Sequence, residues 1–313
     1  MLSDMLESKV RSLIQSPIPL PGAGNTSKRH TKLFDIGREN LSLARLAEAH
    51  WDAVAILAET GRCPEPGSLY GVWASEKPGA ELQLEQQGTV FEIRGSKMFC
   101  TGAGIVDHAL ITTLAPDAQL IDIDLRANHD RVSYDNSDWK SAAFAETQTA
   151  KVTFLGATVT ADQFIGESGW YSERSGFWHG ALGPASCWAG GAAGLLDYAL
   201  SHARNDPHTL AHLGAMHANV WACNAYLDKA GHEIDATPHD SALARKRALS
   251  VRHLIEQACS DILRRLPRAY GPHPLAMNED VIKRYQEVDL YLRQSHAERD
   301  LAQLGEAVRL TSD

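Results

Sequence analysis

The sequence lacks the features that mark several classes of protein. Its five cysteines are scattered and odd in number, and no two form a Cys-x-x-Cys pair, which argues against a disulfide scaffold or a zinc ribbon. No apolar run approaches the roughly 18 residues that a membrane-spanning helix needs. The net charge is −9 and the longest basic run is residues 245–247, so we expect no nucleic-acid partner. Because the first ten residues also lack the form of a signal peptide, we expect a cytoplasmic protein with free thiols and no membrane partner.

Common catalytic motifs are missing as well. The chain has no Gly-x-Ser-x-Gly, no P-loop and no His-Glu-x-x-His sequence. Residues 102–104 read Gly-Ala-Gly, but the third glycine of a dinucleotide fingerprint and the βαβ context are absent, which excludes a Rossmann site. His208 and His212 are four residues apart and would share one helical face, yet a metal site needs a further ligand. We therefore predict no metal site.

What is present is an ordinary globular composition over 313 residues, of which 44% are hydrophobic. Apolar residues recur at helical spacing in residues 31–59, and helical patterns return over 187–203, 210–231, 241–266 and 279–310. Between them, short apolar runs alternate with turn residues at 69–74, 90–93, 97–101, 109–114, 120–125 and 150–155. The pattern predicts an α+β fold in helical–β–helical order: an N-terminal helical segment (1–67), an antiparallel β-barrel or sandwich (68–165) and a C-terminal helical bundle (166–313).

The stretch 92–113 carries the most suggestive chemistry. If it is a regular strand, Phe99 and Thr101 point to the same face, because side chains alternate along a strand. A flat ligand could stack on the ring and hydrogen-bond to the hydroxyl. On the pattern alone, a core Phe and a surface Thr is the simpler interpretation.

The last helical pattern brings charged residues together. Arg293, His296, Arg299 and Asp300 would lie on neighbouring turns of one helix. A histidine beside carboxylates can serve as a proton shuttle near neutral pH. An exposed ion-pair network is the alternative that the pattern favours.

Two motifs in the β-region resemble the acyl-CoA dehydrogenase family. The family's middle domain has a threonine–glutamate motif before a Gly-Ser-Asp loop and then a Gly-x-Lys-x-Trp-Ile-Thr-Asn strand. Residues 74–80 (ASEKPGA) and 95–102 (GSKMFCTG) look like their counterparts. Residues 151–154 and 164–166 resemble the passage into the family's C-terminal helices, so the resemblance covers about residues 45–310. The Gly-Ser-Asp loop is missing, and the N-terminal helical domain is shortened to about half.

The resemblance implies a flavoprotein that holds FAD between the β-domain and the C-terminal helices. Phe99 and Thr101 fall where the family's flavin-facing aromatic and hydroxyl groups sit, and Ser75 replaces a threonine that hydrogen-bonds the isoalloxazine ring. Arg268 and Gly271 stand in place of a motif that reaches the flavin of a neighbouring subunit. By the same resemblance we expect a homodimer or homotetramer, an acyl-CoA-like substrate and an electron-transfer flavoprotein as electron acceptor.

The catalytic base is the main departure from the family. Dehydrogenation of an acyl thioester needs a carboxylate that takes the α-proton. Aligning the last helix with the family's Tyr-Glu-Gly-Thr motif puts Ala297 at that position, between His296 and Glu298. Glu298, from a shifted register, and His296 are therefore the candidate catalytic residues.

Three functions follow from these observations. The leading hypothesis is an FAD-dependent oxidoreductase of acyl-CoA dehydrogenase type that oxidises the α,β C–C bond of a thioester. The end of the chain from His296 also resembles the His-rich C-terminus of flavin-dependent monooxygenases on the same fold, which need no α-proton base. A degenerate binding or scaffold subunit is the third hypothesis, because the base and part of the N-terminal domain are missing.

Overall fold

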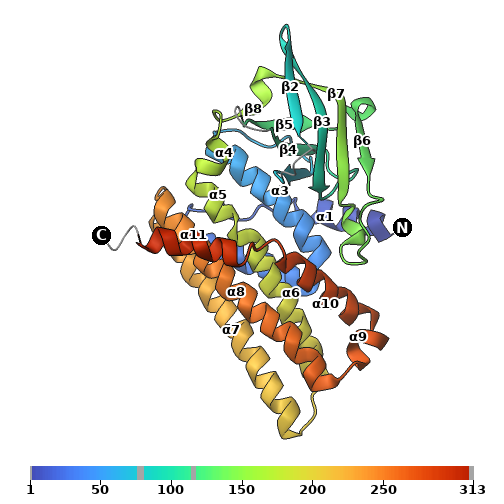
Figure 1. The fold of residues 1–313 in the computed structure, drawn as a ribbon, viewed down its shortest axis with the longest axis vertical. Helices are drawn as coiled ribbons and strands as arrows, with labels where there is room; N and C mark the ends of the chain where they lie inside the picture. The colour runs from blue at the N-terminus through green and yellow to red at the C-terminus, as the bar shows by residue number, and fades with distance from the viewer. Residues whose placement is uncertain (1, 76–80, 114–117, 310–313) are drawn as a thin grey trace. The chain divides into compact units, whose positions relative to one another are not determined.

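The computed structural model describes residues 2–75, 81–113 and 118–309 (Figure 1). The chain forms two compact units, one of Met1–Pro17 with Leu46–Phe177 and one of Ile18–Arg45 with Trp178–Asp313. The predicted order of helices, strands and helices is confirmed. The helices of the predicted segment 1–67 are divided between the two units, because α2 packs with the C-terminal helices whereas most of α3 packs with the strands.

The first unit combines the strands with a few helices. Its helices are α1 (Leu2–Leu13), most of α3 (Leu41–Glu59), α4 (Trp170–Glu173) and the start of α5 (Ser175–Gly180). Its strands are β1 (Tyr70–Trp73), β2 (Leu82–Gln87), β3 (Val90–Cys100), β4 (His108–Thr112), β5 (Leu120–Asp124), β6 (Val132–Asp135), β7 (Ala150–Thr160) and β8 (Phe164–Ile165). Single 3₁₀ turns are η1 (His129–Arg131), η2 (Ala145–Thr147) and η3 (Ala161–Gln163).

The strands form two open four-stranded sheets, ordered β1-β4-β5-β8 and β2-β3-β7-β6. Neither sheet closes on itself, so the barrel form of the prediction is wrong. The pairing is antiparallel as predicted, except that β1 and β4 are parallel. The connection between those two strands runs through β2 and β3 of the other sheet, which gives it the length that a parallel crossover requires.

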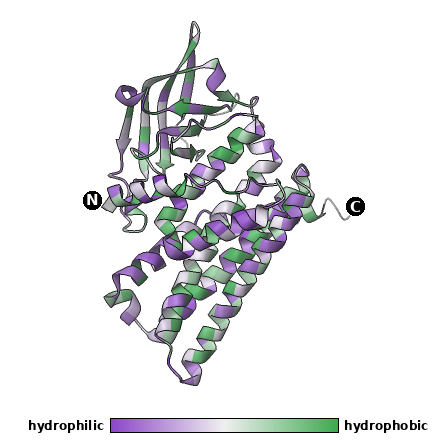
Figure 2. Cartoon of the chain, turned by 180° about the vertical axis from the view of Figure 1, so that it is seen from behind, coloured by the Kyte–Doolittle hydropathy of each residue, from purple (hydrophilic) through white to green (hydrophobic). Residues whose placement is uncertain are grey.

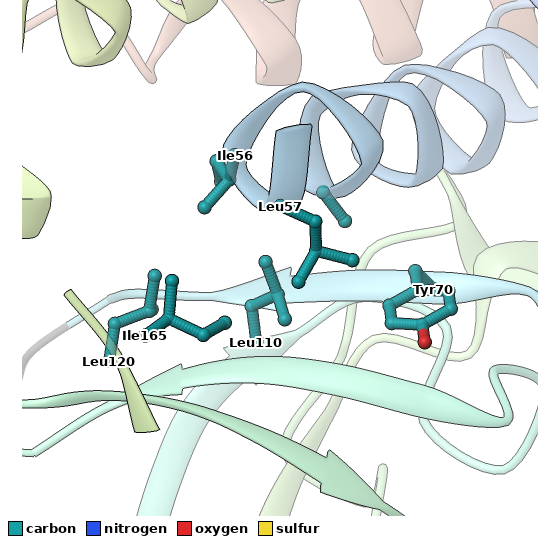
Figure 3. Close-up of a cluster of buried hydrophobic side chains, with 7 residues drawn as sticks. Ile56, Leu57, Tyr70, Leu110, Leu120 and Ile165 are labelled. Atoms are coloured by element: carbon teal, nitrogen blue, oxygen red, sulfur yellow. The ribbon is translucent and has the colours of Figure 1, made fainter. Parts of the chain in front are cut away.

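The core of the first unit lies between α3 and the sheet that contains β1 and β4. Figure 3 shows Ile56 and Leu57 of α3 facing Tyr70 and Leu110 of the strands. These side chains are at most 1% exposed. Burial of one such side chain is worth about 1.5–3 kcal/mol, so this packing holds α3 against the sheet that contains β1 and β4.

Gly95 of β3 is a position where the backbone requires glycine. Its φ is +120°, and a Cβ there would collide with the carbonyl oxygen of Glu81. We expect Gly95→Ala to lower the free energy of unfolding by about 2–4 kcal/mol. Gly88→Ala is the matched control, since Gly88 also has positive φ (+66°) but open space around it. Urea denaturation of both variants checks this, and equal losses would contradict the steric explanation.

The second unit is a bundle of helices. It contains α2 (Thr26–Glu39), α6 (Leu182–Ser201), α7 (Pro207–Ala236), α8 (Ser241–Tyr270), α9 (His273–Met277), α10 (Glu279–Leu292) and α11 (Glu298–Arg309). Figure 2 shows hydrophilic and hydrophobic residues alternating along these helices, as expected for amphipathic packing. Small residues let α2 and α6 approach closely: a Cβ at Gly37 would lie 2.7 Å from the carbonyl oxygen of Cys187. Among the described residues, no helix combines the length and the apolar character needed to cross a membrane.

Three predicted helix limits were wrong, each for a local reason. The helix predicted over 31–59 is two helices that meet at Asn40, whose Oδ1 accepts a hydrogen bond from the Leu43 amide and caps α3. Pro267 does not end α8 but lies inside its last turn, and the helix stops at Gly271, whose φ is +69°. The helix predicted over 279–310 is broken at residues 293–297.

His30 of α2 makes the stability of the second unit depend on pH. It is 2% exposed, and its Nδ1–H donates to the Leu227 carbonyl at 2.9 Å. Burial, assisted by the positive charge of Arg29, lowers the pKa of His30 to about 4. Between pH 6.5 and pH 4 the unfolded chain therefore binds a proton that the folded chain does not, so stability falls as the pH falls through this range.

The expected loss from this one residue reaches about 3 kcal/mol at pH 4, at 1.36 kcal/mol for each unit of pKa shift. His30→Asn keeps an N–H for Leu227 but does not titrate, so it should flatten the pH dependence of the urea midpoint over this range. An unchanged slope would show that His30 is not the group responsible.

Candidate functional site

Backbone strain in the described residues gathers at a few places. Four residues other than glycine have positive φ: Phe99, Phe144, Gln148 and Ala297. Phe99 lies at the end of β3, and Phe144 and Gln148 lie on either side of η2, all in the first unit. Ala297 lies in the connection between α10 and α11 in the second unit. Such conformations cost about 1–3 kcal/mol each and persist where the surroundings enforce them, commonly at functional sites.

Phe99 is displayed rather than buried. The pairing of β3 with β7 shifts register between Lys97 and Cys100, and Phe99 lies in that bulge with φ +59°. Its side chain is 57% exposed, whereas Lys97 and Cys100 on either side are buried. The regular strand from which the sequence placed Phe99 and Thr101 on one face is wrong. The bulge interrupts the alternation of side chains, and Thr101 lies in the turn after the strand.

Thr101 belongs to a short chain of hydroxyl groups. Its Oγ1 lies 3.2 Å from Oγ1 of Thr149, which in turn lies 3.1 Å from Oγ1 of Thr147. The Thr147 hydroxyl donates to the Phe144 carbonyl at 2.9 Å. The sequence analysis did not identify Thr147 and Thr149. The signal that could have found them is their spacing of two residues just before β7, the strand that pairs with β3.

The backbone around Thr101 is held at several points. Trp73 Nε1 donates to the Thr101 carbonyl at 2.9 Å, and the Gly102 amide donates to the Thr147 carbonyl at 2.8 Å. Ser75 is exposed and lies two residues after Trp73, whose side chain contacts the Thr101 backbone. The motif predicted over 74–80 continues into residues 76–80, which lie outside the described residues.

The thiol of Cys100 next to Phe99 is not a nucleophile. Burial raises the pKa of Cys100 to about 12. A thiol that stays protonated at neutral pH is neither a good nucleophile nor a metal ligand. The end of β3 therefore offers an aromatic ring and hydroxyl groups, which suit binding of a flat, polar-edged ligand.

The connection over residues 293–297 in the second unit carries the candidate catalytic residues. Arg252 of α8 donates to the Gln294 carbonyl at 3.0 Å and to the Ala181 carbonyl at 2.7 Å. Its guanidinium lies 4.6 Å from the centroid of the buried Trp188 ring. Ala297, with φ +47°, is therefore part of a connection whose backbone the bundle fixes.

His296 and Asp300 form a pair in this connection. The backbone N–H of His296 donates to Asp300 Oδ2 at 3.1 Å, and Nδ1 donates to Oδ1 at 3.2 Å. The carboxylate thus selects the tautomer with a proton on Nδ1 and leaves Nε2 of the half-exposed ring as the proton-accepting atom. The arrangement needs the break before α11, so the single helix that the pattern predicted would not have produced it.

The other charged residues of this region do not join the pair. Arg293 contacts Asp289 at 2.9 Å on α10. Glu298 is exposed at the first position of α11. Of the two catalytic candidates, His296 is the one that the structure supplies with an orienting partner.

Arg268 and Gly271 lie together at the end of α8, also in the second unit. The Arg268 side chain is exposed, and its carbonyl accepts a hydrogen bond from His208 Nε2 at 3.1 Å. His208 and His212 share one face of α7, as the spacing predicted, with ring centroids 4.7 Å apart. Burial and the nearby His208 lower the pKa of His212. No cluster of three metal-ligating side chains occurs in the part of the chain that the structure describes.

Several solved structures resemble this chain over at least 90% of its length. Dibenzothiophene monooxygenase (TdsC) from Paenibacillus sp. A11-2 matches with a TM-score of 0.77 at 16% identity, over 97% of this chain and 94% of that one. It has also been solved with FMN and indole. The nitrososynthase from Micromonospora carbonacea var. africana matches with a TM-score of 0.76 at 14% identity, over 92% and 81% of the two chains.

A third solved structure is XiaF from Streptomyces sp. in complex with FADH2 and glycerol, with a TM-score of 0.72 at 13% identity, over 90% of this chain and 81% of that one. No protein-family model and no curated protein matches the sequence. At these identities the likeness establishes the fold, which is the acyl-CoA dehydrogenase-like fold predicted from the sequence.

Proposed function

We propose that the protein is a flavin-dependent monooxygenase that uses reduced flavin and O₂ to oxygenate a small molecule. The observation that carries the proposal is the His296–Asp300 pair, which lies next to Ala297, the residue that the sequence resemblance aligns with the carboxylate base of a dehydrogenase. The solved structures support it, since the proteins they show include a monooxygenase with bound FMN and indole and a nitrososynthase. When bound, reduced flavin and O₂ together insert one oxygen atom into the substrate and release the other as water.

The residues at the end of β3 fit a flavin. Phe99 offers an exposed ring whose position is enforced by a bulge, and Thr101 offers a hydroxyl two residues on. An isoalloxazine ring needs an aromatic or apolar wall and hydrogen-bonding groups along its edge, which these two residues supply. Ser75, Arg268 and Gly271 are proposed as further flavin contacts on the strength of the sequence resemblance.

His296 is proposed as the group that moves a proton during oxygenation. The Asp300 carboxylate orients the imidazole so that Nε2 is the atom that accepts a proton, as in other carboxylate–histidine pairs. A histidine in this position can take up the proton that a substrate loses as it is oxygenated. It is not suited to the α-proton of a thioester, whose removal needs a strong, desolvated base.

The leading hypothesis from the sequence, dehydrogenation of an acyl-CoA, is less well supported. Its base would have to be Glu298, which is exposed at the start of α11. Ala297 occupies the position that the alignment assigns to the base. An electron-transfer flavoprotein belongs to that hypothesis, and a monooxygenase would instead draw electrons from whatever reduces its flavin.

The two reactions can be separated by anaerobic titration. The flavin-loaded protein, prepared with FMN and separately with FAD, is mixed with acyl-CoAs of several chain lengths. Monooxygenation predicts no bleaching of the flavin absorbance and predicts an oxygenated product when the reduced protein meets O₂ and indole. Bleaching by any acyl-CoA would restore the dehydrogenase hypothesis, and a protein that takes up neither flavin would support the scaffold hypothesis.

The homodimer or homotetramer stays a prediction that rests on the sequence resemblance alone. Sedimentation velocity of the flavin-loaded protein measures it directly. A monomer at micromolar concentration would exclude the prediction that Arg268 and Gly271 reach the flavin of a neighbouring subunit.

A further inference from the structure

We propose that Arg252 of α8 is a positioning residue for the oxygenation: it holds the connection over residues 293–297, and thereby fixes where His296 stands in the helical bundle. The inference deepens the proposed function and rests on proton transfer by His296. Every residue that it invokes belongs to the second unit.

The His296–Asp300 pair is built by local bonds. Both contacts to the carboxylate span four residues, and the Arg299 amide donates to the His296 carbonyl at 3.1 Å. Such bonds orient the imidazole on the first turn of α11, but they do not fix where that turn lies in the bundle. Packing of α11 adds little, because none of its side chains is buried and its Leu301 is 36% exposed.

Arg252 supplies a bond from the bundle to this connection. Its Nη2 donates to the Gln294 carbonyl at 3.0 Å, two residues before His296. Its Nη1 donates to the Ala181 carbonyl at 2.7 Å, at the residue that precedes α6. Because a guanidinium is planar and holds its donors in a fixed fork, two such bonds set direction as well as distance. The connection is thus tied to the start of α6 through one side chain of α8.

Trp188 of α6 fixes both sides of this tie. It lies seven residues after Ala181, on the same face of the helix, and the Arg252 guanidinium is 4.6 Å from its ring centroid. The ring is 0% exposed and meets the ring of Tyr291 edge-on, with centroids 6.2 Å apart. The Tyr291 carbonyl accepts the Gln294 amide at 3.0 Å. The same buried ring therefore places Arg252 and the end of α10 from which the connection leaves.

Ala297 shows that the path of the connection is imposed. Its φ is +47°, and its amide donates to Ser295 Oγ at 3.3 Å. A left-handed residue with a Cβ persists where its surroundings enforce it, and the Arg252 bond three residues earlier is one such constraint. A proton acceptor works only within hydrogen-bond reach of the proton, and a displacement of about 1 Å can cost about 100-fold in rate. Without Arg252, the pair should survive but lose its fixed place.

The first readout is backbone hydrogen exchange of the whole chain, which needs no flavin. Arg252→Met keeps an unbranched stem beside Trp188 and removes both bonds. The amides of Gln294 and Ser295, which are bonded to carbonyls of α10, should exchange about tenfold faster in the variant. Exchange within α6 and α7 should not change. Unchanged exchange at residues 294 and 295 would overturn the inference.

The second readout is steady-state oxygenation by the flavin-loaded protein. In Arg252→Met, kcat for product should fall about 10–100-fold, whereas KM and the flavin dissociation constant stay within about twofold of wild type. Arg252→Lys keeps the positive charge but replaces the planar fork with a single ammonium, so kcat should fall about tenfold as well. A wild-type kcat in Arg252→Lys would show that charge alone suffices, and would overturn the two-point tie.

Arg245→Met is the matched control. Arg245 also lies on α8, with its guanidinium 5.7 Å from the centroid of the Trp178 ring, and it donates to Gln303 of α11 at 3.0 Å. It contacts α11 beyond the connection, so its loss should leave kcat and the exchange at residues 294 and 295 within about twofold of wild type. Equal losses in both variants would mean that any loosening of α11 has this effect, and would overturn the role of Arg252. A wild type that makes no oxygenated product would instead overturn the proposed function, and hydrogen exchange would still decide whether Arg252 holds the connection.

Discussion

Replacing His296 with asparagine is expected to abolish oxygenated product while leaving flavin binding intact. Asparagine can keep a donor toward Asp300 but has no atom that takes up a proton at neutral pH. Loss of a general acid or base typically lowers the rate about 10²–10⁴-fold. Reduced flavin should still react with O₂ in the variant, so oxygen consumption continues and hydrogen peroxide replaces product. The ratio of product to oxygen consumed is therefore the quantity to measure.

Glu298→Gln is the control for this result. It changes the neighbouring candidate, an exposed carboxylate at the start of α11, and should leave the product ratio within about twofold of wild type. The opposite pattern, with Glu298→Gln inactive and His296→Asn active, would assign the proton transfer to the carboxylate and contradict the proposed function.

Replacing Phe99 with glycine is expected to weaken flavin binding without destabilising the protein. The left-handed backbone at Phe99 costs a residue with a Cβ about 1–2 kcal/mol, and glycine removes that cost. The free energy of unfolding should stay within about 1 kcal/mol of wild type, because the ring is 57% exposed. Loss of the aromatic wall removes about 1–1.5 kcal/mol of stacking, which raises the flavin dissociation constant roughly tenfold.

Leu155 supplies a matched control on β7. Its side chain is also 57% exposed and apolar, but it pairs with Arg94 of β3, away from the bulge that contains Phe99. Leu155→Ala should change neither stability nor flavin affinity appreciably. If Phe99→Gly binds flavin as well as wild type does, the ring is not the flavin wall, and the argument from backbone strain fails with it.

The architecture could be predicted from the sequence because hydrophobic periodicity is strong in this chain. The alternation of short apolar runs and turns located most of the strands, and 3.6-residue periodicity located the helices. β2 and β6 were missed because they are mostly exposed: only one residue of each strand is buried. A strand whose two faces are mostly solvated carries no alternating apolar signal.

The candidate site residues stay predictions, and their local geometry could not be read from the sequence for one physical reason. Phe99, Thr101 and His296 were identified from a resemblance, but their geometry depends on local breaks in regular structure: a bulge at Phe99 and an interrupted helix before His296. Periodicity describes regular elements and cannot register a single residue with positive φ. Asp300, Thr147 and Thr149 contact the candidate residues only across turns and strands, and a sequence pattern does not show such contacts.

The origin of the oxygen atom in the product tests the central claim most directly. Protein loaded with reduced flavin is mixed with ¹⁸O₂ and a panel of indole and arylamine probes, and the products are weighed by mass spectrometry. The proposed function predicts a product that carries one ¹⁸O atom per oxygenated molecule and that disappears in His296→Asn. An absence of labelled product across the panel, together with bleaching of the oxidised flavin by an acyl-CoA, would contradict it.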